Sequence, residues 1–271
     1  MAAASRPPAA KRFGQHHLVD AGTLRAIVGL AAVQPGEVVL EVGAADGVLT
    51  RPLAERAGLV HAFEIDRRFS TALERLAAER PNIRLYVADA LRADLGALAP
   101  PPDALVANLA YSIAIPLIVR SLDELPSVRR WAVMVQKELG ERLFATPSSK
   151  AYSAVSVLVQ LHCQLVAVRP VSRSVFRPQP RVDSSFVVFE RRPAPLYDAG
   201  MGGVEQLVRT AFGQRRKMLA GSLAGTAWRG RTLTRQGVRA ALAALGLPPG
   251  ARPEELAPQQ FVELARRLES A

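Results

Sequence analysis

The sequence has a single cysteine, and it has no group of cysteine and histidine residues at the spacing of a zinc site. An internal disulfide is therefore excluded, and a structural metal is not expected. No uninterrupted apolar run is long enough to span a membrane, and the alanine- and proline-rich residues 1–10 lack the apolar core of a secretory signal. These absences favour the reducing cytoplasm, with neither a membrane nor a metal among the partners.

Lysine is scarce, yet the chain carries 35 Lys and Arg against 24 Asp and Glu, for a formal net charge of +11. Such an excess attracts polyanions, of which nucleic acid is the commonest inside a cell. Arginine- and alanine-rich proteins also arise from GC-rich genomes, so the charge alone does not decide. A chain of 271 residues with 49% hydrophobic content has room for one large globular domain and a small one.

From Val38 onward, short apolar runs alternate with amphipathic stretches, which is the pattern of a parallel sheet flanked by helices. The apolar runs predict strands at Val38–Val42, Val60–Ile65, Ile83–Val87, Ala104–Asn108, Trp131–Val135, Gln164–Val168 and Ser185–Phe189. Helical periodicity predicts helices at Ala21–Ala32, Leu49–Ala57, Arg68–Glu79, Ile115–Leu122 and Glu138–Phe144. No strong helix separates the last two strands, which favours an antiparallel pair at the sheet edge.

The composition changes at Arg192-Pro193-Ala194-Pro195, which has the character of a linker. Beyond it we expect no strand, and helical periodicity occurs at Gly203–Phe212, Arg215–Leu223, Thr234–Leu245 and Pro258–Leu268. The sequence therefore predicts a flexible leader at residues 1–12, an α/β domain at 13–192 and a helical domain at 193–271.

The first three predicted strands each end in a residue suited to hold a nucleotide-like cofactor. These residues are Gly43, Glu64 and Asp89, and ligands of open α/β sheets bind beyond the carboxyl ends of the strands. A lone acid at a strand end is more often a helix cap, but three consecutive strand ends make that interpretation a poor one. Ala45 interrupts the glycine pattern of a dinucleotide fold, so the choice between a nicotinamide and S-adenosylmethionine depends on the fourth strand.

The fourth strand is followed by Asn108-Leu109-Ala110-Tyr111. An adenine amine is a poor nucleophile, because its lone pair is delocalised into the ring. The Asn108 side-chain oxygen and the Leu109 carbonyl can accept the amine hydrogens and direct the lone pair at a methyl sulfonium, while Tyr111 stacks on the base. Orientation supplies most of the rate, so no base with a tuned pKa is needed. The segment therefore predicts methyl transfer from S-adenosylmethionine to adenine.

This tetrapeptide resembles the N-L-P-Y segment of the small-subunit rRNA adenine dimethyltransferase family. Further segments similar to motifs of that family lie at Phe13–Asp20, Val135–Leu143, Tyr152–Gln160, Val175–Ser184 and Phe212–Leu219. The resemblance covers nearly everything from Arg12 to the end of the chain. It implies a Rossmann-like class I methyltransferase with a seven-stranded, mostly parallel sheet and a small all-helical C-terminal domain.

The resemblance also implies roles for individual residues. Contacts with S-adenosylmethionine are expected from His16, Leu18, Gly43, Glu64, Asp89, Ala90 and Asn108. Asn108 and the Leu109 carbonyl would orient the target amine, and Tyr111 would stack on the base. Phe176 would close the other face, although by itself it would be assigned to the core.

At three positions the chain departs from the family pattern. His16 replaces an asparagine, Ala45 replaces a glycine, and Ala110 replaces the proline of N-L-P-Y. A proline would fix the backbone at the reaction centre, so alanine makes the tetrapeptide more mobile. From this we expect a working but slower enzyme.

The intact motifs resemble those of the enzymes that modify the small subunit. The implied product is N6,N6-dimethyladenosine at two adjacent adenosines in the 3′-terminal hairpin of 16S rRNA, with a role in small-subunit biogenesis. Two alternatives stay open: a 23S rRNA methyltransferase of macrolide resistance, and a non-catalytic RNA-binding assembly factor.

The expected partners are ribosomal RNA and the immature small subunit, and we expect a monomer. A basic triplet such as Arg215-Arg216-Lys217 is usually a solvated surface, but it can also pair with RNA phosphates. Phosphate contacts are expected from Lys11, Arg12, Lys137, Arg142, Arg215, Arg216 and Lys217.

Overall fold

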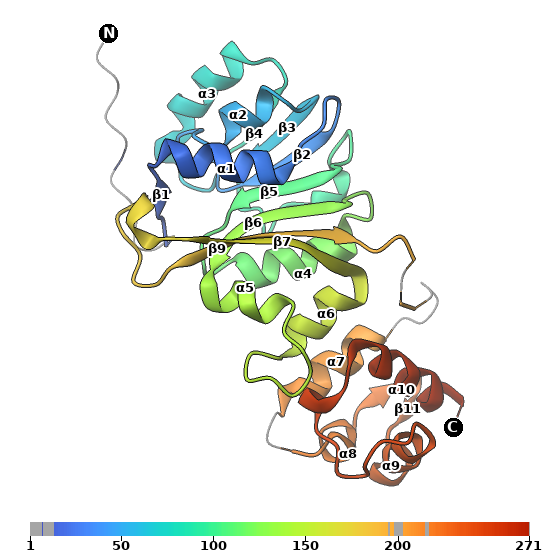
Figure 1. The fold of residues 1–271 in the computed structure, drawn as a ribbon. Coiled ribbons are helices and arrows are strands. Elements are labelled where there is room, and N and C mark those ends of the chain that lie inside the picture. The colour runs from blue at the N-terminus through green and yellow to red at the C-terminus, as the bar shows by residue number, and fades with distance from the viewer. Residues whose placement is uncertain (1–6, 8–13, 195, 198–202, 215–216, 271) are drawn as a thin grey trace. The chain divides into compact units, whose positions relative to one another are not determined.

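A computed structural model describes residues 7, 14–194, 196–197, 203–214 and 217–270 (Figure 1). The chain divides into two compact units. The first runs up to Gly140 and includes Gln164–Arg191, and the second consists of Glu141–Cys163 and the chain from Arg192 onward. The second unit thus includes Glu141–Cys163, which lies within the α/β domain predicted at residues 13–192. The limits of the two domains remain a prediction.

The first unit contains a seven-stranded sheet in the order β4-β3-β2-β5-β6-β9-β7. The strands are β2 (Val38–Val42), β3 (Leu59–Phe63), β4 (Ile83–Tyr86), β5 (Ala104–Asn108), β6 (Arg130–Gln136), β7 (Cys163–Val171) and β9 (Ser184–Arg191). The first five of these strands pair in parallel, and β9 runs antiparallel to β6. The predicted seven-stranded, mostly parallel sheet is therefore confirmed.

The helices of the first unit follow the strands in the predicted alternation (Figure 1). They are α1 (Ala21–Ala31), α2 (Thr50–Ala54), α3 (Ser70–Glu79), α4 (Ala114–Glu124) and α5 (Lys137–Leu143), of which α5 continues into the second unit. Asp20 caps α1 by accepting a hydrogen bond from the Thr23 amide. A 3₁₀ turn at Arg67–Phe69, capped by Asp66, precedes α3.

The central strands are buried along almost their whole length because helices cover both faces of a parallel sheet. All five residues of β2 are buried, and the four residues of β5 before Asn108 are buried as well. Trp131 of β6 stacks on Phe189 of β9 at 5.4 Å between ring centroids. This packing holds the antiparallel strand firmly against the parallel part of the sheet.

A second, two-stranded sheet joins β1 (His17–Leu18) to β8 (Phe176–Arg177). The strands run antiparallel, with His17 opposite Arg177 and Leu18 opposite Phe176. Strands of two residues carry no periodicity, so the sequence did not predict this pair. The pairing fixes the segment before α1 beside the loop between β7 and β9.

In the second unit, the described residues form α6 (Ala154–His162), α7 (Val204–Gly213), α8 (Leu219–Leu223), α9 (Arg235–Ala244) and α10 (Pro258–Ser270). Helix α6 was not predicted, and the expected helix at Arg215–Leu223 begins only at Leu219. The expectation of a tail without strands is also wrong, because β10 (Ala227–Trp228) and β11 (Arg231–Thr232) form a hairpin.

The turn of this hairpin explains why it was missed. Arg229 and Gly230 both have positive φ, 46° and 82°, as a tight two-residue hairpin turn requires. The first turn position is normally Asn, Asp or Gly, so an arginine gave no turn signal.

In the described part of the chain, no helix is long and apolar enough to cross a membrane.

Candidate cofactor and base site

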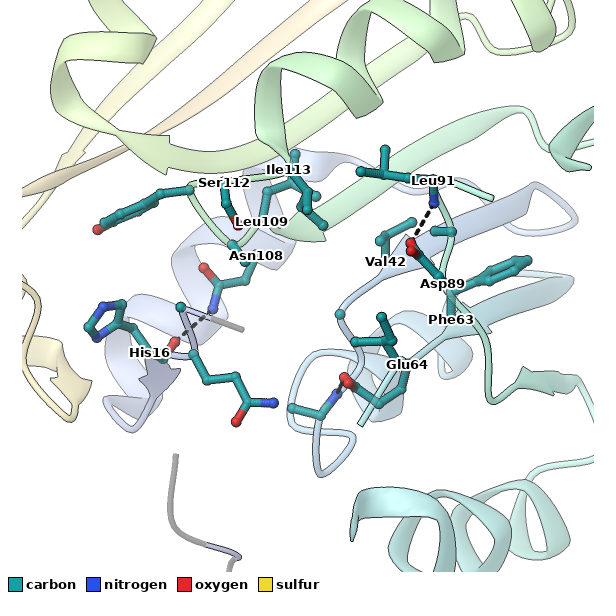
Figure 2. Close-up of a pocket in the computed structure, with 18 of the residues that line it drawn as sticks. His16, Val42, Phe63, Glu64, Asp89, Leu91, Asn108, Leu109, Ser112 and Ile113 are labelled. Carbon is teal, nitrogen blue, oxygen red and sulfur yellow. Dashed lines mark hydrogen bonds between the residues drawn. The ribbon is translucent and has the colours of Figure 1, made fainter. Parts of the chain in front are cut away.

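A cavity of about 220 Å³ lies at the carboxyl ends of β2, β3, β4 and β5 (Figure 2). Of the predicted cofactor and base residues, those that line it are His16, Gly43, Glu64, Asp89, Ala90, Asn108, Leu109, Tyr111 and Phe176. Leu18 does not line it and is buried in the hydrophobic core. Gln15 and Ser184 also line the cavity and were not predicted. The tertiary structure thus brings four strand ends and the N-terminal segment around one space.

The turn after β2 passes close to the end of β5. Gly43 has a φ of +83°, and a Cβ placed on it would lie 3.6 Å from the backbone oxygen of Asn108. Glycine adopts this conformation without strain. Ala45 also has a positive φ, 50°, which is unfavourable for a residue with a side chain by roughly 1 kcal/mol.

The Glu64 carboxylate connects the ends of β2 and β3. It is 4% exposed, and its two oxygens accept hydrogen bonds from the backbone amides of Ala45 and Asp66, each at 2.8 Å. Burial raises the pKa of Glu64, while these two amides act in the opposite direction. Each carboxylate oxygen has a second lone pair, so Glu64 can still accept hydrogen bonds from a ligand in the cavity.

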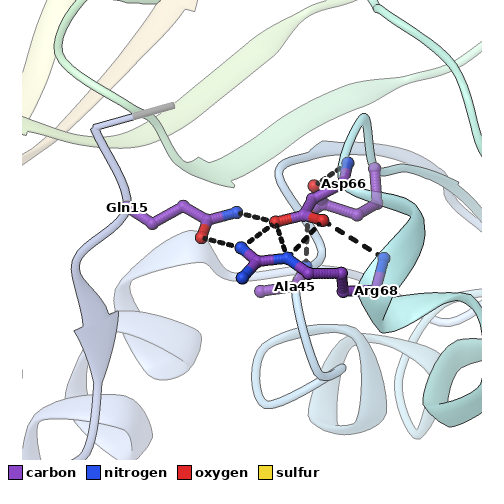
Figure 3. A network of polar contacts seen from close by, with 5 residues as sticks. Gln15, Ala45, Asp66 and Arg68 are labelled. Atoms are coloured by element: carbon purple, nitrogen blue, oxygen red, sulfur yellow. Dashed lines mark hydrogen bonds and ion pairs between the residues drawn. The ribbon is translucent and has the colours of Figure 1, made fainter. Parts of the chain in front are cut away.

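Asp66, Arg68 and Gln15 form a polar network beside Glu64 (Figure 3). Arg68 binds both carboxylate oxygens of Asp66, and Gln15 Nε2 donates to Asp66 Oδ2 at 3.0 Å. Hydrogen bonds from the Arg68 side chain hold the pKa of Asp66 well below its usual range. The network ties the N-terminal segment to the end of β3 and so keeps His16 at the cavity.

Asn108 is oriented by the same N-terminal segment. Its Nδ2 donates to the backbone carbonyl of His16 at 3.2 Å (Figure 2). A carbonyl only accepts, so this contact requires the amide nitrogen on that side and leaves Oδ1 as an acceptor. An acceptor without charge is what the predicted orientation of an adenine amine needs.

The Tyr111 ring has contacts on two sides. The His16 ring lies 5.8 Å from it at a tilt of 33°, and the Tyr111 hydroxyl lies 3.0 Å from Ser184 Oγ. His16 Nδ1 donates to the Pro178 carbonyl at 2.8 Å, which fixes the imidazole. Phe176 is 2% exposed and belongs to the hydrophobic core as well as to the cavity wall.

Asp89 follows β4 and lines the cavity at that end. The Asp89 Oδ1 accepts a hydrogen bond from the Leu91 backbone amide at 2.9 Å. The other carboxylate oxygen, Oδ2, lies 3.6 Å from Arg92 Nε. The neighbouring Ile65 and Val87 are exposed apolar side chains at the ends of β3 and β4. An apolar edge beside a carboxylate suits a purine with an exocyclic amine.

The predicted RNA-binding residues are only partly described. Lys137 and Lys217 are exposed, and Arg142 is half-buried, whereas Lys11, Arg12, Arg215 and Arg216 lie outside the described residues. The loop between β7 and β9 adds three exposed arginines that the sequence analysis did not single out, Arg173, Arg177 and Arg181. Pro178 and Pro180 lie among them and argue against a helix, and the β1–β8 pairing places Arg177 opposite His17, which lines the cavity.

Replacing Glu41 with glutamine is expected to stabilise the protein at alkaline pH. Glu41 lies on β2, is 1% exposed, and its Oε2 has no hydrogen-bond partner among the described residues. Burial, together with the nearby Glu64 charge, raises the pKa of Glu41 to about 8. Since the unfolded chain ionises at the ordinary value of 4.5, stability falls as the pH rises from 4.5 to 8.

Urea unfolding at pH 5 and pH 8 tests this expectation. The E41Q variant should be more stable than the parent by about 4 kcal/mol at pH 8 and by less than about 1 kcal/mol at pH 5. The exposed Glu74 of α3 offers a matched control, E74Q, that should leave the pH dependence unchanged. Parallel pH curves for the parent and E41Q would contradict the prediction.

Comparisons with known proteins agree with this site. The model of the ribosomal RNA adenine dimethylase family matches residues 8–249. The chain is 47% identical over 262 residues to ribosomal RNA small subunit methyltransferase A of Rubrobacter xylanophilus, a match that covers 97% of this chain and 96% of that protein. It is 41% identical over 260 residues to the protein of the same name from Kineococcus radiotolerans, with 94% and 84% covered.

Solved structures of rRNA and adenosine methyltransferases are also similar to this chain. A dimethyladenosine transferase from Plasmodium falciparum superposes with a TM-score of 0.77 at 25% identity, covering 92% of this chain and 96% of that one. The 23S rRNA methyltransferase ErmE gives 0.69 at 29% identity, with 93% and 99% covered. The family match over most of the chain, joined to the cavity at the strand ends, confirms the resemblance: the chain belongs to the ribosomal RNA adenine dimethylase family.

Proposed function

We propose that this methyltransferase transfers methyl groups from S-adenosylmethionine to the N6 amines of two adjacent adenosines in the 3′-terminal hairpin of 16S rRNA. The observation that carries the proposal is the orientation of Asn108, whose Nδ2 is engaged by the His16 carbonyl. Its Oδ1 therefore faces a ligand as an acceptor, next to the aromatic wall of Tyr111.

The residues of the cavity fit S-adenosylmethionine. The buried Glu64 carboxylate suits the two ribose hydroxyls, and Asp89 suits the adenine amine. The methionine part is assigned to the turn at Gly43, where no side chain stands between the ends of β2 and β5. When bound, the cofactor supplies an electrophilic methyl group on a sulfonium.

The residues of the chain act by orientation. Asn108 Oδ1 and the Leu109 carbonyl accept the hydrogens of the target amine, so its lone pair is held toward the methyl group. Tyr111 stacks on the target base and fixes its plane, as base-modifying enzymes require. The partial negative charge of these two oxygens stabilises the positive charge that develops on the amine, so no proton transfer is needed beforehand, and the surplus amine proton leaves to water after the methyl group is bound.

The choice of the small subunit is supported by the relatives. Those at 47% and 41% identity are named for the small subunit, whereas the 23S enzyme ErmE is 29% identical. Modification of 23S rRNA is thus the second candidate. The immature small subunit as partner, a monomeric state, catalysis without a metal and a cytoplasmic location remain predictions of the sequence.

Methyl transfer to purified ribosomal subunits tests the proposal. With labelled S-adenosylmethionine, we expect transfer to immature small subunits that lack the modification, and mapping of the product to two adjacent adenosines. Transfer to large subunits instead would favour the second candidate. Binding of the cofactor without transfer to either subunit would point to a non-catalytic assembly factor.

Exposed arginines of the loop between β7 and β9 are expected to bind the phosphates of the RNA. Each phosphate contact increases the slope at which log affinity falls with log salt by about 0.7 to 0.9. The variants R177Q and R181Q should each weaken RNA binding and reduce this slope by about one contact. The exposed Arg75 of α3 serves as a control, since R75Q removes the same charge away from the loop. Equal slopes for the three variants and the parent would rule out this binding surface.

A further inference from the structure

We infer that Ser184 is a positioning residue that aims the Tyr111 ring at the target base. Its Oγ lies 3.0 Å from the Tyr111 hydroxyl, and its side chain is 1% exposed at the cavity wall. The inference rests on the proposed function, in which Tyr111 stacks on the adenine. It concerns a residue on a different strand from the reaction segment, 73 positions away in the sequence.

The Tyr111 segment has only sparse anchoring of its own. The Leu109 amide donates to the Met134 carbonyl at 3.1 Å, and the Ile113 amide donates to the Ala110 carbonyl at 3.0 Å. The first bond anchors the end of β5, and the second closes the turn of residues 110–113 that contains Tyr111. The backbone between them includes Ala110, whose φ no ring restricts. The direction of the Tyr111 side chain therefore depends on the contacts of its hydroxyl group.

Ser184, by contrast, is held rigidly. It is the first residue of β9 and lies opposite Gln136 in the β6–β9 pairing. The preceding residue, Asp183, accepts a backbone hydrogen bond from Lys137 at 3.0 Å. A hydroxyl fixed in this way provides a stationary partner at the edge of the cavity.

The geometry of tyrosine determines what the contact controls. The hydroxyl lies on the axis about which the ring flips, so a bond to it restrains the swing of the whole side chain about χ1. The tilt of the ring is restrained separately by the His16 ring at 5.8 Å, which the Pro178 carbonyl fixes in turn. Ser184 thus sets where the ring stands, and a displaced ring would misalign the base before transfer.

A double-mutant cycle with S184A and Y111F tests the inference. Either variant removes the same hydrogen bond and keeps the aromatic ring. A hydrogen bond of this kind contributes about 1 kcal/mol, so we expect each single variant to lower kcat about three- to tenfold. The affinity for S-adenosylmethionine should not change, and the KM for RNA should change little. The double variant should be no slower than the single ones, because both remove one interaction.

Ser185 provides the matched control. It is buried on the same strand, but its side chain faces Gly140, so S185A should keep the parent rate. A parent-like kcat for S184A, or losses that multiply in the double variant, would overturn the inference while the parent enzyme still transfers methyl groups.

A measurement that needs no activity separates this inference from the proposed function. The chain has four tyrosines, so ¹³C-labelled tyrosine rings give few NMR signals to assign. In S184A the Tyr111 signal should broaden or split as the ring samples a second χ1 position, and in S185A it should not. An unchanged Tyr111 signal in S184A would refute the inference even if no RNA substrate were methylated.

Discussion

Replacing Asn108 with alanine is expected to slow methyl transfer by about 100- to 1,000-fold, the effect of removing one oriented polar group from a transition state. The variant loses the Oδ1 acceptor that directs the lone pair of the amine. Of the two assigned acceptors, only the backbone carbonyl of Leu109 remains. The affinity for S-adenosylmethionine should stay close to that of the parent, because the ribose and adenine contacts are assigned to Glu64 and Asp89. Single-turnover rates and calorimetric titration of the cofactor measure the two quantities.

The chain itself supplies the control for this experiment. Asn82 is its only other asparagine, and it donates to the carbonyls of Ala54 and Ala57. The N82A variant should lose stability without losing rate at a temperature where it is folded. A rate within tenfold of the parent for N108A would show that the chemistry is performed by other residues.

Replacing Glu64 with glutamine is expected to weaken S-adenosylmethionine binding by about 30- to 100-fold. The carboxylate accepts two backbone hydrogen bonds, and hydrogen bonds to charged groups contribute about 1.5 to 3 kcal/mol each. A glutamine would face one of these amides with its own N–H, so the turn at Ala45 would lose a partner. The rate at saturating cofactor should fall much less than the affinity.

The affinity should also depend on pH through this group. Because burial raises the pKa of Glu64 above 4.5, the ionised form that binds ribose is lost at a higher pH than for an exposed glutamate. Calorimetry between pH 5 and 8 should show weaker binding toward the acid end in the parent and a flatter profile in E64Q. An exposed-site control, E74Q, should bind as the parent does, and an E64Q variant with parent-like affinity would remove Glu64 from the cofactor site.

The sheet could be predicted from the sequence because buried strands consist mainly of apolar residues, which form recognisable runs. Strands β2 and β5 are buried, so their residues are apolar except for Glu41 and the terminal Asn108. Because strands that alternate with helices run in parallel, their carboxyl ends, with Gly43, Glu64, Asp89 and Asn108, lie at one edge of the sheet. The elements that were missed, α6 and the β10–β11 hairpin, have weak local signals: α6 is apolar with little periodicity, and the hairpin turn uses an arginine.

By itself, the sequence determined the residue types at the strand ends and the chemistry that they allow. Only the tertiary structure decided which of them meet. Asn108 contacts His16 across 92 positions, Tyr111 contacts Ser184 across 73, and Gln15 contacts Asp66 across 51. Periodicity describes a residue's relation to its near neighbours along the chain, whereas these contacts depend on how the strands, the β1–β8 pair and the turns pack in space. For that reason the motif-like segments around Gln15 and Ser184 did not show that these two side chains line the cavity.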